Sequence, residues 1–521
     1  MQPIRRGGVA LAACTAAILW LTSGTAWASS TDGGGTVAKK LTHGDISLNL
    51  LWIVIGAVLV IFMQAGFALV ETGFCRAKHA AHVVSTNFAI FGLGFVAYFC
   101  VGYAFMFGGF SFPGVFGYDK AIGTHLIGSA NHVFLWKGGF FLGGHAYDVS
   151  VLAFFLYMVA FMDTTATIPT GAMAERWKWN SFVLWGLFCG AFYYPLFGAW
   201  TWGGGWLARL GASAHFGHGY TDFAGSGVVH MMGGAAALAG ALVLGPRLGK
   251  YGPDGKPRTL AAHHIPMAML GTFILLFGWF GFNAASTFGA TDNRFAVVAA
   301  NTAIAAAFGA VFGMLWVQLR SKDHKPDPGM MANGMLAGLV AITAPCAFVQ
   351  PWAAALIGII AGCLVVESVW FIERRGVDDP VGAISVHGVC GAWGVLSVGI
   401  FADGTYGGDW NLTGIKTTNL WGVFYGHGGG GQLLAQAAGV LTIATVMFGI
   451  AYLFFRIQHA LTKGGIRPSA EVELQGVDIP EMGVLAYPEF YGSSPHVESG
   501  GPGGGHTPMP EPVPVGQEHS R

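Results

Sequence analysis

Apolar runs long enough to cross a lipid bilayer recur along almost the whole chain. A helix needs about 20 mostly apolar residues to span the hydrocarbon core. Eleven runs reach that length, at 47–72, 83–109, 148–170, 180–202, 224–246, 264–288, 295–318, 329–348, 351–372, 380–402 and 430–456. The sequence therefore predicts an all-α integral membrane protein with eleven transmembrane helices.

The composition favours packed helices over a β-barrel. Charged residues make up only 10% of the 521 residues, whereas soluble domains contain about 25%. The chain has 82 glycines, and glycine lets helix backbones approach closely in lipid. The formal net charge is zero, so nothing indicates a nucleic-acid partner. The seven cysteines form no C-x-x-C pair, which argues against zinc, iron–sulfur and disulfide frameworks.

The two ends of the chain differ from its apolar centre. Residues 1–28 combine two arginines, an apolar stretch and an Ala-Trp-Ala site, which is typical of a cleavable signal peptide. An uncleaved first helix is the alternative. Residues 29–46 are expected to form an external N-terminal segment. Residues 492–521 are rich in Gly and Pro, which predicts a disordered tail.

Lysine and arginine test the orientation, because cytoplasmic loops carry most of these residues. An external mature N-terminus and eleven crossings place the C-terminus in the cytoplasm. The loops that this topology places inside contain thirteen basic residues, and the external loops contain five. The chain is therefore predicted to be a multi-pass protein of the inner (cytoplasmic) membrane.

A pattern in the fifth span recurs in the tenth. DFAGSGVVHMMGG places Asp222 eight residues before His230, and DPVGAISVHGVCG places Asp379 eight residues before His387. The two spans run in opposite directions, so spans 1–5 and 6–10 form a predicted inverted repeat, with the eleventh helix outside it. An aspartate suits a helix N-terminus, and eight residues of α-helix rise about 12 Å into a core about 30 Å thick. The two imidazoles are predicted to meet near the midplane, where transporters of this plan have their sites.

A pair of buried histidines suits proton transfer better than tight cation binding. Desolvation favours neutral imidazoles, and two neutral rings can share one proton because each has one N–H and one lone pair. Such a pair fits a small substrate that exists in charged and neutral forms. A packing role is the alternative for a single buried histidine, and the matched spacing of His230 and His387 favours function.

Aromatic residues flank the same predicted path. YYPLFGAWTWGGGW places Trp202 at an external helix end, where its π face can attract a cation. FGWFGFNAAS adds Trp279, Phe282 and Ser286, with Ser286 four residues after Phe282 and hence on the same helix face. Aromatic residues at a membrane interface are also common anchors, so that alternative stays open.

Several stretches resemble the ammonium transporter family (Amt/Mep/Rh), in particular its Amt branch. The stretches are DFAGSGVVHMMGG, GWFGFNAAS, DDPVGAISVHGVCGAWG, PTGAMAERWKW, WTWGGGW, QPWAA and GVDIPEMGVLAYPEF, and the resemblance covers about residues 45–490. It implies a homotrimer in the lipid bilayer, in which each eleven-helix domain (47–458) has its own apolar pore. The implied substrate is ammonium or ammonia, with methylammonium as an analogue. The resemblance implies a role in nitrogen metabolism, without enzymatic activity or a cofactor.

The resemblance also implies roles for single residues. An external site would recruit ammonium through Trp202, Ser286, Phe161 and Asp222. Two phenylalanines, Phe161 and Phe282, would close the pore entrance. The conducting path would be lined by a proton relay of His230 and His387, with Trp279 and Asp379 as supporting residues. Potassium is nearly the size of ammonium but has no proton to leave behind, so such a path would exclude it.

Two positions depart from the family pattern. Residues 459–491 resemble the cytoplasmic regulatory segment, which usually reads GLDxxxHG, but Met482 stands in place of the histidine. Binding of a PII-type signal protein and coupling between subunits therefore stay open. His79 stands where the family usually has Asn, and we expect it to be a loop or helix-end residue and not a ligand.

Two other functions fit parts of the pattern. An ammonium sensor would use the same fold to signal through its tail, but the tail here is short. A haem-binding membrane oxidoreductase would use His230 and His387 as axial ligands. The chain lacks further histidine pairs at haem spacing, which argues against the second function.

Overall fold

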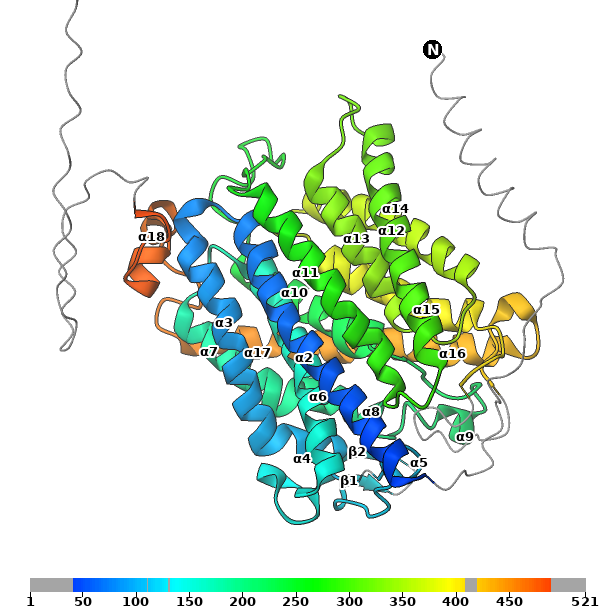
Figure 1. The fold of residues 1–521 in the computed structure, drawn as a ribbon. Coiled ribbons are helices and arrows are strands. Elements are labelled where there is room, and N and C mark those ends of the chain that lie inside the picture. Colours follow the sequence, from blue (N-terminus) through cyan, green and yellow to red (C-terminus); the bar gives the residue numbers. More distant parts are fainter. Residues whose placement is uncertain (1–40, 110, 130–131, 408–418, 489–521) are drawn as a thin grey trace, which may run out of the picture. The chain divides into compact units, whose positions relative to one another are not determined.

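The computed structural model describes residues 41–488, apart from 110, 130–131 and 408–418. The predicted signal peptide (1–28), Cys14 and the predicted tail (492–521) lie outside the described residues. Long helices account for most of the remainder, and many of them run alongside one another (Figure 1).

Ten helices in the described part of the chain are long and apolar enough to cross a membrane. Several of them are continuous runs of α-helix with short π-helical or 3₁₀ turns. They are α2 (His43–Phe74), η1–α3–η2–α4 (Ala77–Phe107), α6 (Val149–Met173), α7–η5–α8 (Trp179–Trp200), η6–α10 (Ser226–Leu244), α11–η7 (Ile265–Thr287), α12 (Arg294–Arg320), α14 (Pro351–Arg374), η8–α15 (Ile384–Phe401) and α16–η11–α17 (Gly429–Leu461). The predicted multi-pass helical fold is confirmed.

The remaining apolar run forms a shorter helix than predicted. α13 (Pro328–Thr343) has 16 residues, or about 24 Å of helix, and ends before the predicted limit of residue 348. Ala224 N–H donates to the Thr343 carbonyl (3.1 Å) and Phe223 N–H to the Ala344 carbonyl (3.2 Å). These bonds occupy carbonyls at the end of α13, and Pro345 has no N–H to extend the helix. The count of eleven crossings therefore stays a prediction.

Glycines lie at close contacts between helices, as their number predicted. α2 and α11 (Ile265–Ala284) run side by side (Figure 1), and a Cβ atom on Gly66 would lie 3.0 Å from the Gly271 carbonyl oxygen. α10 (Met232–Leu244) and η8 (Ile384–Val389) approach more closely, because a Cβ on Gly234 would lie 2.2 Å from the Gly388 nitrogen. Such backbone contacts are a common source of helix association in lipid.

The connection between the helical run Ala77–Phe107 and α6 contains a β-hairpin. Strands β1 (Thr124–Ser129) and β2 (His132–Lys137) pair antiparallel, with Thr124 opposite Lys137. The Trp136 indole N–H donates to the Gly203 carbonyl (2.9 Å), which attaches the hairpin to the chain after α8 (Tyr194–Trp200). The short helices in this and other connections are α5 (Pro113–Phe116), η3 (Phe140–Leu142), η4 (Gly144–Ala146), α9 (Leu210–Ala214) and η10 (Val423–Tyr425).

The segment after α17 (Phe448–Leu461) packs at the other end of the bundle from the hairpin (Figure 1). It contains α18 (Ala470–Gln475) and η12 (Asp478–Met482). The Asp478 carboxylate accepts hydrogen bonds from the His82 N–H (2.9 Å) and the Ala81 N–H (3.1 Å) at the start of α3 (Ala80–Ala97). His79 ends η1 (Ala77–His79), as expected for a helix-end residue, and its Nδ1 accepts from the Val477 N–H (3.3 Å).

Candidate substrate pore

Aromatic and imidazole rings form a continuous column between the helices. Phe161 of α6 stacks on Phe282 of α11 with 4.0 Å between ring centroids. Trp202 lies 5.8 Å from Phe161 on one side, and His230 lies 5.3 Å from Phe282 on the other. His387 follows at 5.2 Å from His230. The fold thus brings five predicted site residues together, although 185 residues of sequence separate the second histidine from Trp202.

The two histidines are buried and in direct contact. His230 Nδ1 lies 3.2 Å from His387 Nδ1, and the two side chains come from η6 (Ser226–Met231) and η8. One Nδ1 must carry the proton and the other must accept it, so two neutral rings have opposite tautomers. This close contact also leaves no room for a haem iron ligated by both rings, which disfavours the oxidoreductase alternative.

The path from each aspartate to its histidine is not a single α-helix. Gly225 and Gly382, three residues after the aspartates, have φ of 112° and 82°, a left-handed region that glycine adopts readily. η6 begins only after the first of them, at Ser226, and both histidines lie in π-helical turns. The predicted rise of about 12 Å along a continuous α-helix is therefore wrong, although the two rings still meet.

Each aspartate accepts hydrogen bonds from the start of its helix. Asp222 accepts from the N–H groups of Gly225 (2.9 Å), Gly227 (2.8 Å) and Val228 (2.8 Å). In the second copy, Asp379 accepts from the N–H groups of Gly382 (2.9 Å) and Ile384 (2.7 Å). Burial raises the pKa of Asp222, whereas these backbone donors lower it and so oppose the shift. The matched bonds show that the motif repeated in the sequence is also repeated in the local structure.

Two of the predicted recruitment residues have fixed polar contacts. The Trp202 indole N–H donates to the Asp222 carbonyl (2.7 Å), and the side chain is 9% exposed. Ser286 lies in η7 (Ala285–Thr287), where its hydroxyl donates to the Phe282 carbonyl (2.8 Å). Ser286 therefore lies on the same helix face as Phe282, as its spacing predicted.

Two residues behind the rings were missed by the sequence reasoning. Tyr157 lies one turn before Phe161, and its hydroxyl is 3.0 Å from Ser286 Oγ. Thr343 Oγ1 accepts from the Trp279 indole N–H (2.9 Å), while Trp279 stacks on His230 with 5.0 Å between ring centroids. The i−4 spacing from Phe161 could have indicated Tyr157. Thr343 is distant in sequence, so no local pattern pointed to it.

The described residues contain no cluster of side chains suited to binding a metal ion. No group of three or more His, Cys, Asp or Glu side chains in that part of the chain could hold a metal ion. The fold and the ring column define a multi-pass helical membrane protein with a column of buried rings where the two copies of one motif meet.

Residues 51–487 match the Ammonium Transporter Family, and the chain belongs to this family. It is 43% identical to the ammonium transporter Amt2 of Archaeoglobus fulgidus over 467 residues, which cover 89% of this chain and 93% of Amt2. The solved structure of a sensor Amt protein is similar, with a TM-score of 0.72, 34% identity and coverage of 85% of this chain and all of that one. Candida albicans Mep2 has a TM-score of 0.68 and 28% identity, and the match covers 88% of this chain and 94% of Mep2.

Proposed function

We propose that this ammonium transporter conducts its substrate as neutral ammonia along the ring column, while the substrate's proton passes along His230 and His387. The observation that carries the proposal is the 3.2 Å contact between the two Nδ1 atoms, made by inverted copies of one motif. A full charge at the bilayer centre costs at least about 2.5–3.5 kcal/mol. Separating the proton from ammonia avoids this cost along the apolar part of the path.

Recruitment takes place at the Trp202 end of the column. The π face of Trp202 attracts the cation, and the Ser286 hydroxyl offers an acceptor for the hydrogen bonds that ammonium donates and potassium does not. Asp222 shapes this site through its backbone bonds and does not take the substrate's proton. The neighbouring Phe161 is the first apolar group that the substrate meets.

Phe161 and Phe282 form the gate. Their rings stack at 4.0 Å with an angle of 24° between planes, so neither leaves space for a substrate in this conformation. Passage requires a brief movement of the two rings, and rotamer changes of this kind are fast compared with domain motions. A gate of side chains excludes water and hydrated cations without moving any helix.

The relay moves one proton without leaving a charge on both rings. An incoming proton binds to Nε2 of the first ring, whose Nδ1 carries a hydrogen. The Nδ1–H bond of that ring then breaks, and this second proton passes to Nδ1 of the other ring. The second ring then releases the proton from its own Nε2. His230 Nε2 is buried and has no partner among the described side chains and backbone groups, so it is available for this exchange.

The proposal is tested by recording the charge that moves across the membranes of proteoliposomes adsorbed on a solid-supported membrane. Ammonium pulses to the wild type are expected to give currents, and potassium pulses are not. His387→Glu or His230→Asp places a potential anion in the path, so potassium currents are expected to rise. A double change of both histidines to Leu is expected to abolish ammonium current. If this double variant kept full ammonium current and still excluded potassium, the histidines would be packing residues.

A second candidate function is ammonium sensing. It is favoured by the similarity to the sensor Amt protein and by the docking of the 462–482 segment on the starts of α3 and α7. A pure sensor would bind methylammonium but show no flux above that of empty liposomes. Flux in the same preparation therefore separates the two functions, and the 43% identity with Amt2 favours transport.

The wider assembly follows the family. The protein forms a homotrimer in the inner membrane after removal of residues 1–28, with the mature N-terminus outside and residues 459–491 in the cytoplasm as a surface for a PII-type protein. Native mass spectrometry tests the trimer, and N-terminal sequencing of the mature protein tests the cleavage. A mass equal to that of one chain would contradict the trimer. A mature protein that still begins at Met1 would contradict the cleavage.

A further inference from the structure

One face of α16 (Gly429–Thr442) carries two buried glutamines that the proposed transport path does not use. Gln432 is 1% exposed and Gln436 is fully buried. Residues four apart lie on the same side of a helix, and Gln432 Nε2 donates to Gln436 Oε1 (3.1 Å). A buried amide side chain needs partners for its two N–H donors and its oxygen, so the other partners of these glutamines show what this face of α16 holds.

Both glutamines bind the backbone that leads to the recruitment site. Gln436 Oε1 accepts from the Thr221 N–H (2.8 Å), and Gln436 Nε2 donates to the Thr221 carbonyl (2.6 Å). Gln432 Oε1 accepts from the His218 N–H (2.9 Å), and Gln432 Nε2 donates to the Gly219 carbonyl (2.9 Å). Gln436 lies 215 residues after Thr221 in the sequence, so the fold brings α16 to this stretch of backbone.

The bonds to Thr221 affect the recruitment site because Asp222 is the next residue. The Asp222 carbonyl accepts from the Trp202 indole N–H (2.7 Å), so a shift of the backbone at Thr221 would move the group that fixes this ring. Gln436 Nε2 also donates to the Val395 carbonyl (3.0 Å). Both donors and both acceptor positions of the Gln436 amide are therefore occupied, and a fully bonded buried side chain rigidifies its surroundings.

A glycine on the same face of α16 makes room for Tyr220 beside Asp222. A Cβ atom on Gly439 would lie 2.1 Å from the Tyr220 ring, so a side chain there would displace the ring. The Tyr220 hydroxyl donates to Asp222 Oδ2 (3.2 Å), and the ring is fully buried. Gly439 lies three residues after Gln436 and hence on the same helix face. This face of α16 therefore reaches Asp222 through its backbone and through its carboxylate.

The second copy of the motif is held by charged groups instead. The residue before Asp379 is Asp378, whose carbonyl accepts from Arg176 Nη2 (2.7 Å) and whose carboxylate accepts from Arg247 Nε (2.8 Å). A guanidinium carries a positive charge that would repel an arriving cation, whereas a glutamine amide binds the backbone without a charge. The neutral side chains thus hold the copy of the motif at which a cation is proposed to bind.

We propose that Gln436 is a positioning residue for substrate recruitment. Through Thr221 it keeps the Asp222 carbonyl at the Trp202 indole, and the π face of this ring stays turned toward the arriving cation. The inference rests on the proposed recruitment at Trp202 and adds a residue that does not itself contact the substrate.

The concentration dependence of methylammonium uptake into proteoliposomes of the full-length protein tests this proposal. Gln436→Met removes the four hydrogen bonds of this side chain but replaces it with a flexible chain that can fill the space. The half-saturating concentration is expected to rise about 2- to 30-fold, as for Trp202→Leu, because the change acts through that ring. The saturating rate per folded protein is expected to stay within about 2-fold, since a loss of uniform binding raises KM at constant kcat.

A matched control removes another buried glutamine from the same run of helix. Gln458 of α17 is 6% exposed, and its Nε2 donates to the Ser181 carbonyl (2.8 Å). Gln458→Met is expected to leave the half-saturating concentration unchanged. A merely structural effect of either change would lower the amount of folded protein in the membrane and leave this concentration as in the wild type.

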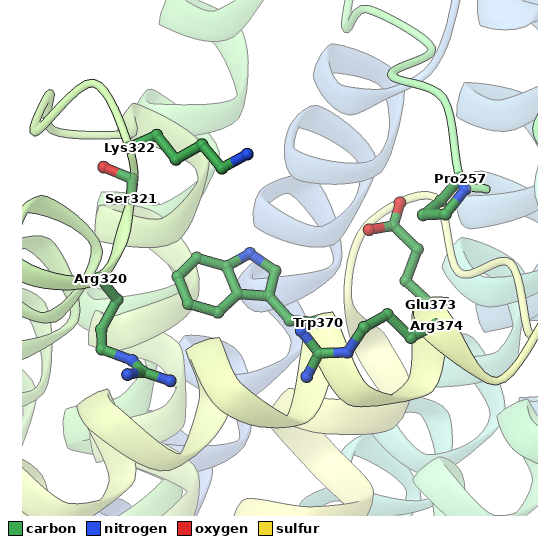
Figure 2. Close-up of a pocket in the computed structure, with 7 residues that line it drawn as sticks. All are labelled: Pro257, Arg320, Ser321, Lys322, Trp370, Glu373 and Arg374. Atoms are coloured by element: carbon green, nitrogen blue, oxygen red, sulfur yellow. The ribbon is translucent and has the colours of Figure 1, made fainter.

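A double-mutant cycle tests whether Gln436 acts through Trp202. In a Trp202→Leu background, Gln436→Met is expected to change the half-saturating concentration by less than about 2-fold, because the two changes share one interaction. Trp370→Leu supplies the control background, in which Gln436→Met is expected to keep its full effect. Figure 2 shows the Trp370 ring in a groove of about 380 Å³, and no residue that lines this groove belongs to the ring column or to α16.

Three results would overturn the proposal. A rise of the half-saturating concentration in Trp202→Leu but not in Gln436→Met would keep recruitment at the ring and remove the role of the glutamine. An equal rise from Gln436→Met with and without Trp202 would show that the glutamine acts elsewhere. No rise in Trp202→Leu would overturn recruitment at this ring, and the positioning role with it.

A second variant covers the case in which Gln436→Met does not fold, as judged by its size-exclusion profile. Gln432→Met frees only the backbone at His218 and Gly219, further from Asp222, so a smaller rise of the half-saturating concentration is expected. No rise in this variant would then overturn the proposal.

Discussion

Hydrogen bonds behind the ring column fix some of its rings and leave others free. The indole of Trp202 is held by the Asp222 carbonyl, and that of Trp279 by Thr343 Oγ1. Rotating either ring would break a bond with a net value of about 0.5–1.5 kcal/mol. Phe161 and Phe282 have no polar atom that could be fixed in this way. The residues proposed as the gate are therefore the ones that can move most easily.

The first prediction concerns Trp202. Trp202→Leu removes a cation–π contribution of about 0.5–2 kcal/mol, so capture of methylammonium is expected to weaken about 2- to 30-fold. Uptake of labelled methylammonium at limiting concentration measures this. Trp202→Phe retains a π face and is the control, with a smaller loss expected. Unchanged uptake by Trp202→Leu would make this residue an interface anchor only.

The second prediction separates shape from charge at Asp222. Asp222→Asn keeps one acceptor oxygen for the helix N–H groups, whereas Asp222→Ala leaves the three donors of Gly225, Gly227 and Val228 without their acceptor. Uptake by the Asn variant is therefore expected to exceed uptake by the Ala variant, at equal amounts of folded protein in the membrane. Equal damage by both changes would mean that the negative charge itself is required.

The contact between α10 and η8 leads to a prediction about packing. Gly234→Ala places a Cβ 2.2 Å from the Gly388 nitrogen, and overpacking of this kind costs about 1–3 kcal/mol. Thermal unfolding in detergent is expected to show a lower Tm. Gly449→Ala is the matched control, because its Cβ meets nothing within 4 Å. A Tm as high in Gly234→Ala as in Gly449→Ala would show that the two helices can separate at little cost.

Buried ion pairs join the ends of the helices on the α18 side. Glu175 accepts from Arg76 Nε (2.7 Å) and Arg247 Nη1 (3.0 Å), and Arg247 Nε also donates to Asp378 (2.8 Å). Burial alone would raise the pKa of Glu175, but Arg247, His79 and Arg76 outweigh it and hold this pKa below its usual value. The pKa of Asp378 is lowered in the same way, against its burial, by Arg176 and Arg247.

The fourth prediction is a loss of stability in acid. A carboxyl group whose pKa is lower in the folded state than in the unfolded state stabilises the fold at pH values above the unfolded-state pKa of about 4. This stabilisation is lost as the pH falls through the folded-state pKa. The Tm is expected to be nearly constant from pH 7 to 5 and to fall below about pH 4. Glu175→Gln removes one of the two carboxylates that pair with Arg247; because Asp378 remains, the cost is expected to be below the about 3–5 kcal/mol of breaking a buried pair completely. The Tm of this variant should fall less steeply in acid. The exposed pair of Asp254 with Lys256 supplies the control, since Asp254→Asn should change neither quantity.

Local patterns predicted the helices well and their interruptions poorly. Hydropathy located the apolar runs because each run depends only on its own residues. The π-helical turn at His230 and the end of α13 depend instead on contacts with distant segments, such as the bond between Ala224 and Thr343. The β1–β2 hairpin was missed for a similar reason, because Trp136 is fixed by Gly203, a residue of another connection.

The meeting of the two histidines was predictable although its geometry was not. The equal spacing from Asp222 to His230 and from Asp379 to His387 indicated two inverted copies, and the matched bonds of both aspartates agree with that. The Nδ1–Nδ1 contact depends on where Gly225 and Gly382 turn the backbone. A left-handed turn is a property of the folded chain that the letter G alone does not specify.

The crossing of Gly234 and Gly388 restricts how this transporter can work. Many transporters with inverted repeats rock one half against the other, so that the site opens alternately to each side. Here the backbones of α10 and η8 touch at Gly234 and Gly388, beside the histidines. Rocking would separate these backbones, and the two glycines have no side chains that could fill the space between them. The proposed gate of Phe161 and Phe282 is therefore expected to open by side-chain movement, while the helix scaffold stays in place during each turnover. In the proposed mechanism one ammonia and one proton cross together, so net flux is expected to follow the electrochemical gradient of ammonium and to reverse when that gradient reverses.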